Sequence, residues 1–277
     1  MSILSDNDWA FFRKNGYVIV PNAVPQDHLD ATIEATFDFL GMAPDRPEDW
    51  YRAPLRTNGM AEIYHHPAMW DNRQHPRMHQ IFSEIWGTEQ LWVSIDRISF
   101  KPPPHPDYPD YEHKGFIHWD ADTSKLPLNF GVQGVLYLTD TAENQGGFQC
   151  IPGIHNQLTN FGVNHPSDYQ YVRPDLKQFT PQPITGTAGD LLIWHRALAH
   201  GSGHNTSDRP RLAQYISMRP ATLTDEEYRQ QRIRLWKSRE APSSRAFPGD
   251  PRGWEKERPS AKLTSLGRKL LGLDYWE

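Results

Sequence analysis

The sequence predicts a mainly β protein with flanking helices, built as a sandwich or jelly roll. Beyond residue 90 the chain is a series of short runs rich in β-branched and aromatic residues, separated by Gly, Pro and Asn; this pattern is typical of sandwiches and jelly rolls. Outside the interval 90–220, apolar residues recur mostly at helical spacing. We expect one domain over 1–277, with N-terminal helices in 1–90, a jelly-roll core at about 90–220 and a helical tail over 221–277.

Capping residues and apolar periodicity predict the N-terminal elements, because Ser, Asp or Pro commonly begins a helix and Gly commonly follows its end. The expected elements are, in order, a helix over "SDNDWAFFRKNG" that begins at Ser5 or Asp6 and ends at Gly16, a strand over "YVIV" (17–20), a helix from Pro25 to Gly41, irregular chain over 43–72, and a short helix over "HQIFSEIWG" (79–87).

The strands of the predicted core follow. They are "LWVSIDRISF" (91–100), "GFIHWDAD" (115–122), "FGVQGVLYLTD" (130–140), "GGFQCIPG" (146–153), "PQPITGTAGDLLIWH" (181–195) and "RLAQYISMRP" (211–220). In the tail, "DEEYRQQRIRLWKSRE" predicts a helix, and "LTSLGRKLLGLDYWE" predicts an amphipathic one. We consider two roles for that last helix: it covers the β core, or it forms a homodimer.

Composition narrows the class of protein. The chain has 277 residues, 37% hydrophobic and 23% charged, with a formal net charge of −5. These values suit a soluble globular protein and give no electrostatic reason to expect nucleic acid or an anionic membrane as partner. The single cysteine, Cys150, excludes an intramolecular disulfide and a cysteine-based zinc site. With neither a secretory signal pattern nor an apolar run of about 20 residues, we expect a cytoplasmic protein.

Residues 115–122 combine an apolar face with an unusual polar one. Alternation along a strand places His118, Asp120 and Asp122 on one face. That face is either ordinary solvated surface or a metal site. Two histidines and one carboxylate hold iron in many non-haem oxygenases. Since this segment supplies one histidine, the other ligand must come from a distant part of the chain.

The candidate for the missing ligand lies in "GDLLIWHRALAHGSGHNTSDRPR", residues 189–211. His200 follows a predicted strand and lies in a Gly-rich loop, which can approach a ligand closely. Eleven residues later, Arg211 begins the next predicted strand. A guanidinium binds carboxylate through two hydrogen bonds, so this arginine suits a dicarboxylate cosubstrate.

Together with "HWD", "GGFQCIPGIHN", "NGYVIVPNAVP" and "FKPPP", this stretch resembles the phytanoyl-CoA dioxygenase family of Fe(II)/2-oxoglutarate oxygenases, over roughly residues 8–220. The resemblance implies a double-stranded β-helix, that is, a cupin-like jelly-roll barrel. Residue by residue, His118, Asp120 and His200 match the iron ligands. Arg211 matches the residue that pairs with the far carboxylate of 2-oxoglutarate, and Ser202 matches a residue that assists it. No catalytic residue beyond the metal ligands is expected.

The resemblance also implies the reaction. A C–H bond of a small organic substrate is hydroxylated or otherwise oxidised while 2-oxoglutarate and O2 give succinate and CO2, with ascorbate as a stimulant. Asp120 favours oxygenation, because halogenating relatives have a small residue at this position. Two alternatives remain open from the residues. A cupin-like metal isomerase has no need of Arg211 and Ser202, and a non-catalytic jelly-roll binding protein has no need of the iron ligands.

Further residues are assigned to the site from their positions. We expect Gln133, which alternates with Val135 on a predicted strand, and Lys101, which ends a strand before Pro102, to contact the cosubstrate; Lys101 could instead extend to solvent. The residues expected to line the substrate pocket are Tyr64, Asp122, Tyr137 and His204.

Overall fold

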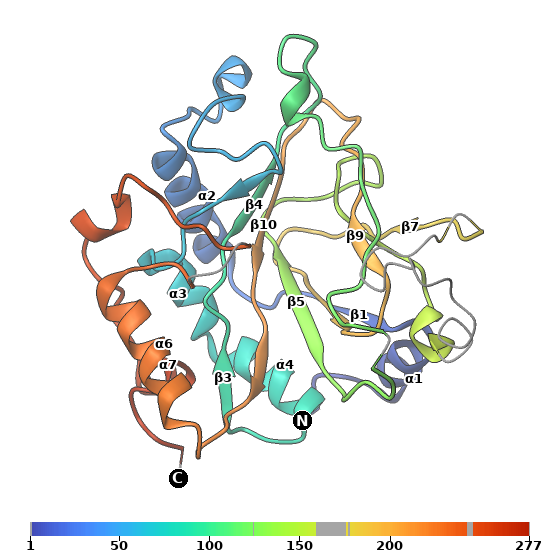
Figure 1. Ribbon diagram of the computed structural model, residues 1–277, viewed down its shortest axis with the longest axis vertical. Helices are drawn as coiled ribbons and strands as arrows, with labels where there is room; N and C mark the ends of the chain where they lie inside the picture. Colours follow the sequence, from blue (N-terminus) through green and yellow to red (C-terminus); the bar gives the residue numbers. More distant parts are fainter. Residues whose placement is uncertain (1, 124, 159–175, 177, 243–245, 277) are drawn as a thin grey trace.

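The computed structural model describes residues 2–123, 125–158, 176, 178–242 and 246–276, and its strands form three antiparallel sheets (Figure 1). A six-stranded sheet has the order β1-β8-β5-β10-β4-β2, a three-stranded sheet the order β7-β6-β9, and a two-stranded sheet pairs β11 with β3. The strands are β1 (Tyr17–Val20), β2 (Met60–Ala61), β3 (Leu91–Val93), β4 (Ile98–Lys101), β5 (Val132–Tyr137), β6 (Phe148–Cys150), β7 (Gln182–Pro183), β8 (Leu191–His195), β9 (His200–Ser202), β10 (Arg211–Tyr215) and β11 (Met218–Pro220).

Helices surround these sheets. In Figure 1, α2, α3 and α4 lie against one side of the large sheet, α1 lies beside β1, and α6 and α7 lie beside β3. Four short 3-10 helices lie in the connections that the structure describes. The helices are α1 (Asp6–Asn15), α2 (Gln26–Leu40), η1 (Pro47–Trp50), α3 (Pro67–Arg73), α4 (Pro76–Trp86), η2 (Pro109–Tyr111), η3 (Ile154–Asn156), α6 (Glu226–Ser238), η4 (Trp254–Glu257) and α7 (Ser265–Leu271).

The six-stranded sheet is buried on both faces, because alternate residues of its strands enter two different hydrophobic clusters. In β8, Leu191 and Ile193 belong to the cluster under the helices. Leu192 and Trp194 belong to a second cluster, together with Phe148 of the three-stranded sheet. The two sheets therefore face each other, and the side chains that β4, β5 and β10 direct toward the smaller sheet enter the space between them.

The N-terminal predictions are confirmed. The Ser5 hydroxyl accepts a hydrogen bond from the backbone N–H of Asp8, whose carboxylate in turn accepts from the backbone N–H of Ser5. Gly16 ends α1 with φ at 84°, and Gly41 ends α2 with φ at 65°, a region that glycine enters without steric cost. The strand over 17–20 is present as β1.

In the following segment one prediction is wrong, and one predicted helix is present but begins earlier than expected. The interval 43–72 is not irregular throughout, because it contains η1, β2 and most of α3. Helix α4 begins at Pro76, three residues before the predicted helix over 79–87. Proline as the first helical residue explains both starts: α3 begins at Pro67 and α4 at Pro76, and proline loses no hydrogen bond there.

Several predicted strands are divided. Residues 91–100, 181–195 and 211–220 each form two strands that belong to different sheets. The prediction of a strand over 115–122 is wrong, since this segment forms a single β-bridge with β9, in which His118 and His200 exchange backbone hydrogen bonds of 2.8 and 3.0 Å. The segment can still direct alternate side chains to one side where it is extended. His200, predicted in a loop, lies in β9.

The tail covers the two-stranded sheet. Leu270 and Leu271 of α7 are fully buried, and Arg232 of α6 donates to the carbonyl of Val93 in β3 (2.6 Å) and to those of Leu270 and Leu271 (3.0 and 3.1 Å). This is the covering role considered for the last helix; the homodimer stays a prediction. Among the described residues, every helix is too short or too polar to cross a membrane.

Candidate metal centre

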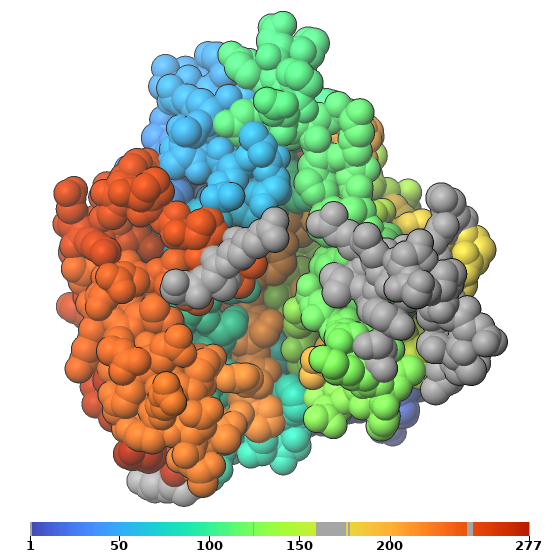
Figure 2. Space-filling model, in the orientation of Figure 1, coloured from blue at the N-terminus to red at the C-terminus, as the bar shows by residue number. Residues whose placement is uncertain are grey.

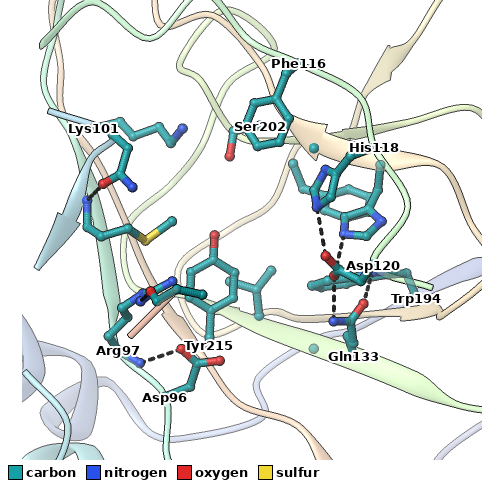
Figure 3. A pocket seen from close by; sticks show the side chains of 18 of the residues that line it. Asp96, Arg97, Lys101, Phe116, His118, Asp120, Gln133, Trp194, Ser202 and Tyr215 are labelled. Carbon is teal, nitrogen blue, oxygen red and sulfur yellow. Dashed lines mark hydrogen bonds and ion pairs between the residues drawn. The ribbon is translucent and has the colours of Figure 1, made fainter. Parts of the chain in front are cut away.

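Three of the predicted residues meet at one point between the sheets. The Nε2 atom of His118 lies 3.0 Å from Oδ1 of Asp120, and Nε2 of His200 lies 3.4 Å from Oδ2 of the same carboxylate. One ligand atom from each residue lies within 4.8 Å of the other two. Figure 3 shows the His118 ring directed at the Asp120 carboxylate. This is the only such group of His, Cys, Asp or Glu side chains in the part of the chain that the structure describes.

The backbone places the two histidines side by side through a close approach at Gly201. In addition to the His118–His200 pair, Phe116 donates its backbone N–H to the carbonyl of Ser202 (3.2 Å). A Cβ atom at Gly201 would lie 1.8 Å from the carbonyl oxygen of Phe116. Glycine at this position therefore allows the segment that carries His118 to contact β9.

The hydrogen bonds around the three residues suit a bound cation. The Nδ1 atom of His200 lies 2.8 Å from the carbonyl oxygen of Leu198, so Nδ1 donates and Nε2 keeps its lone pair for a metal. Gln133 donates from Nε2 to Oδ2 of Asp120 (2.8 Å), and its Oε1 accepts from Nε1 of Trp194 (3.0 Å). The Trp194 N–H thereby determines the orientation of the amide, because only the amide NH2 can then face the carboxylate.

Asp120 is held in its ionised form. Burial opposes ionisation, but the neighbouring imidazoles of His118 and His200 outweigh it and hold the pKa of Asp120 below its ordinary value. Two imidazole nitrogens and one carboxylate are the donor set of non-haem iron(II) sites, in which three coordination positions stay open for other ligands. The chemistry of these three side chains fits iron(II).

A cavity of about 450 Å³ opens beside this centre. Figure 2 shows a hollow in the middle of this face of the molecule. The predicted residues Lys101, Gln133, Ser202 and Arg211 all line the cavity, as do the three candidate ligands. A space of this size accommodates small molecules.

Two basic side chains, Lys101 and Arg211, line the cavity. Lys101 and Arg211 are paired residues of β4 and β10 and lie on the same face of the sheet. Their exposed fractions are 1% and 2%. The ammonium of Lys101, and the Nε and Nη1 atoms of Arg211, have no hydrogen-bond partner among the described residues. Buried N–H groups are rarely left unpaired, so these atoms indicate a site for an anion.

The electrostatics of Lys101 agree with an anion site. Burial, and after it the neighbouring Arg211 guanidinium, hold the pKa of Lys101 well below its ordinary value. Figure 3 shows the Lys101 ammonium directed toward the interior of the cavity. Ser202, in the strand that carries His200, is buried and faces the same space. The anion site and the metal centre therefore share one cavity.

Two residues predicted for the substrate pocket lie outside this lining. Tyr64 donates its hydroxyl to Glu62 and borders a different cavity, near η4. Tyr137 follows the alternation of β5 as predicted, but its hydroxyl donates to the carbonyl of Ile184 (2.8 Å) deep between the sheets. Both residues were predicted from their positions along the chain, which do not show how deeply a side chain is buried or which cavity it borders.

Asp122 and His204 also lie outside the lining. Asp122 is 3.2 Å from the Lys125 ammonium, on the protein surface. His204 is 3.1 Å from Glu112, so it connects two loops. The predicted alternation that would bring Asp122 beside Asp120 is wrong, because the segment is not a continuous strand.

Several lining residues were not identified from the sequence, among them Asp96, Trp194 and Tyr215. Trp194 and Tyr215 carry a usable signal, since alternation along β8 and β10 places them on the same strand faces as Leu192 and Ala213. Asp96 has no such signal because it lies between β3 and β4. Only the structure reveals that this turn lines the cavity.

The sequence of this chain is similar to those of known dioxygenases. The family model for phytanoyl-CoA dioxygenase (PhyH) matches residues 12–213. The chain is 26% identical over 249 residues to the Ava biosynthesis cluster protein O of Aspergillus versicolor, covering 79% of this chain and 80% of the relative. It is 25% identical over 230 residues to the ectoine dioxygenase of Halomonas elongata, covering 72% and 65%.

A solved structure shares the fold. It is the epimerase SnoN in complex with Fe3+, alpha-ketoglutarate and nogalamycin RO, with a TM-score of 0.55 at 17% identity, covering 94% of this chain and 95% of that one. The prediction of a mainly β, jelly-roll fold with flanking helices is confirmed by this likeness and by the facing sheets.

Proposed function

Because this chain belongs to the phytanoyl-CoA dioxygenase family, it is a non-haem iron and 2-oxoglutarate dependent dioxygenase, and we propose that it works through the cavity between the two sheets. In this proposal His118, Asp120 and His200 hold iron(II). The substrate is a small organic molecule whose C–H bond is hydroxylated or otherwise oxidised while 2-oxoglutarate is converted to succinate and CO2. Molecular oxygen as oxidant and ascorbate as stimulant belong to the same proposal.

The observation that carries the assignment is the pair of buried basic side chains. Lys101 and Arg211 lie in the cavity with donor atoms that have no partner among the described residues. A carboxylate at this position satisfies both, and Arg211 can bind it through two parallel hydrogen bonds. We assign it the far carboxylate of 2-oxoglutarate, with the Ser202 hydroxyl as an assisting donor. A metal isomerase without a cosubstrate leaves these basic side chains unexplained.

The remaining residues orient and protect the site. Gln133 keeps one oxygen of Asp120 engaged, which leaves the other free as a metal ligand. This role differs from the cosubstrate contact predicted for Gln133. The rings of Phe148 and Trp194 pack against His200, with centroids 5.7 and 5.0 Å away, and restrict its rotation. Iron at this centre supplies oxygen activation coupled to decarboxylation of the 2-oxo acid.

The first test is spectroscopic. Iron(II) is added anaerobically to the purified protein and 2-oxoglutarate is titrated in, while the weak visible charge-transfer band of an iron-bound 2-oxo acid is recorded. We expect the band in the native protein and its loss in His118→Ala. Arg211→Ala should still give the band, but only at 2-oxoglutarate concentrations roughly ten-fold higher or more, since it lacks the charged hydrogen bonds.

The opposite result would contradict the proposal. If metal binds to the folded native protein and no band forms at any 2-oxoglutarate concentration, the proposed ligand set or the cosubstrate site is wrong. Succinate release coupled to oxygen uptake then provides the independent check of the reaction class once a substrate is found.

A further inference from the structure

The cavity contains a third charged group that neither the metal nor the cosubstrate explains. Asp96 lies in the turn between β3 and β4 and lines the cavity together with Tyr215 and Phe247. Figure 3 shows Asp96, Lys101 and the His118–Asp120 pair at three separate positions around the cavity. The acidic position is therefore distinct from both the anion site and the metal centre.

Asp96 is held rigidly by its surroundings. Its Oδ1 atom accepts the backbone N–H of Arg97 at 2.8 Å. Its backbone carbonyl accepts a hydrogen bond from the guanidinium of Arg73, a fully buried side chain. These bonds fix the turn and leave the second carboxylate oxygen without a hydrogen bond among the described residues. The carboxylate is preorganised to accept one from a bound molecule.

The neighbouring charges are already paired elsewhere. The guanidinium of Arg97 lies 3.4 Å from the buried carboxylate of Glu62 and 4.2 Å from the ring centre of Phe247, and it donates to the carbonyl of Ala246. Among the described residues, no cationic side chain lies within ion-pair distance of Asp96. With Asp120 assigned to the metal and Lys101 and Arg211 to 2-oxoglutarate, Asp96 is the acidic group of the cavity that makes no ion pair among the described residues, although Arg97 and Arg73 act on it from further away.

A partly buried carboxylate in this situation attracts a cation. Burial raises the pKa of Asp96 to about 6, although the positive charge of Arg97 and the hydrogen bond from its backbone N–H act in the opposite direction. A positively charged ligand at Asp96 relieves the unfavourable burial of its charge. The aromatic rings of Tyr215 and Phe116 also line the cavity and offer apolar surface for the rest of such a ligand.

We propose that Asp96 is the specificity-determining residue of this enzyme and that the substrate is a small organic cation, with a protonated amine or amidine that binds the Asp96 carboxylate. The inference rests on the proposed function, because it takes the metal and 2-oxoglutarate sites as occupied by their own ligands. The amine anchors the substrate at the acidic position, and the C–H bond that is oxidised belongs to the part of the molecule that extends toward the His118–Asp120 pair.

The test compares matched ligands on native protein and on Asp96→Asn. Protein loaded anaerobically with iron(II) and 2-oxoglutarate is screened by thermal shift against sets of similar molecules that differ in charge, such as phenethylamine, 2-phenylethanol and 3-phenylpropionate, or agmatine and its uncharged analogues. Binding is then titrated through the change in the charge-transfer band. We expect the cations to bind more tightly than their neutral and anionic counterparts.

The variant separates charge from shape. Asn keeps the oxygen that accepts the Arg97 N–H and removes the charge, so Asp96→Asn should bind cationic ligands roughly ten-fold to a hundred-fold more weakly, and neutral ones about equally. Asp96→Glu, which keeps the charge on a longer side chain, should retain preference for cations. The preference for cations is overturned if no cation binds more tightly than its neutral counterpart, or if Asp96→Asn binds cations as well as the native protein does.

Failure of the two proposals can be told apart. The band that 2-oxoglutarate gives with iron is recorded before any test ligand is added, in native protein and in Asp96→Asn. If the native protein with iron(II) and 2-oxoglutarate gives no charge-transfer band, the proposed function is refuted. A normal band with no cation preference refutes the role of Asp96 alone.

Discussion

Lys101 shows how one residue can connect cosubstrate binding to pH. In the cosubstrate-free protein, burial and Arg211 hold the pKa of its ammonium well below the ordinary value. A carboxylate placed between the two side chains favours the charged form and raises that pKa again. Lys101 is therefore expected to gain a proton when 2-oxoglutarate binds.

This linkage can be measured by calorimetry of 2-oxoglutarate binding to metal-loaded protein, in buffers with different ionisation enthalpies. Above the pKa of Lys101 in the free protein, we expect uptake of up to one proton, and affinity that falls as the pH rises. Below that pKa the affinity should not change with pH through this group. Lys101→Met removes the uptake. Equal proton uptake in the variant and the native protein would assign the proton to another group.

Gln133 acts on the metal through Asp120, so replacing Gln133 should weaken metal binding. In Gln133→Leu the Oδ2 atom of Asp120 loses its amide donor and the indole N–H of Trp194 loses its acceptor. Metal affinity should fall about ten-fold to a hundred-fold, as is usual for residues that orient a ligand. Titration with Co(II) measures it. Trp194→Phe, which removes only the orienting bond, should cause a smaller loss; an unchanged affinity in both variants contradicts the role.

At the level of elements, the contact between residues 116–118 and β9 assembles the metal centre. Because a Cβ at Gly201 would meet the Phe116 carbonyl at 1.8 Å, Gly201→Ala must push the two segments apart and separate His118 from His200. We expect a folded protein whose Co(II) affinity is reduced ten-fold or more, which corresponds to about 1.4 kcal/mol or more.

Gly203→Ala is the matched control for this prediction. Its nearest neighbour would be the carbonyl oxygen of Gly147 at 3.6 Å, an ordinary contact. The control should bind metal as the native protein does, by the same titration. Similar losses in both variants would mean that glycine is required for the flexibility of the strand rather than for the close approach.

The same elements explain which parts of the fold and site could be predicted. Helices α1 and α2 were predicted within a residue because their caps and periodicity are local properties. His118, Asp120 and His200 were predicted to form one site from the motif and the spacing of the residues. The pairing of 115–122 was mispredicted because whether an extended segment joins a sheet depends on its neighbours in space. Asp96 was missed for the same reason, since no local pattern marks a turn that borders a distant cavity.

At the scale of the whole molecule, the α6–α7 layer stabilises the fold and lies away from the cavity lining. Arg232 is buried in this layer and donates to three backbone carbonyls, two of them at the end of α7. Positive charge at the C-terminus of a helix is favourable. Arg232→Met leaves these carbonyls without a donor and should lower the free energy of unfolding by about 2 kcal/mol.

Urea denaturation measures this effect. Arg234→Met, an exposed position on the same helix, should stay within about 0.5 kcal/mol of the native protein. Well below the unfolding transition, both variants should bind 2-oxoglutarate with native affinity. A change in that affinity would show that the layer communicates with the cavity.

The strand order of the large sheet has a consequence for synthesis of the chain on the ribosome. The strand β10 pairs with both β4 and β5 and is the last of the six to be made. Until it emerges, the nascent chain presents β4 and β5 with open edges, and β1 likewise lacks its partner β8 through most of translation. Exposed edges and late, long-range pairings favour aggregation. The growing polypeptide is therefore a natural client for chaperones, and its folding is completed only after residue 215 has left the ribosome.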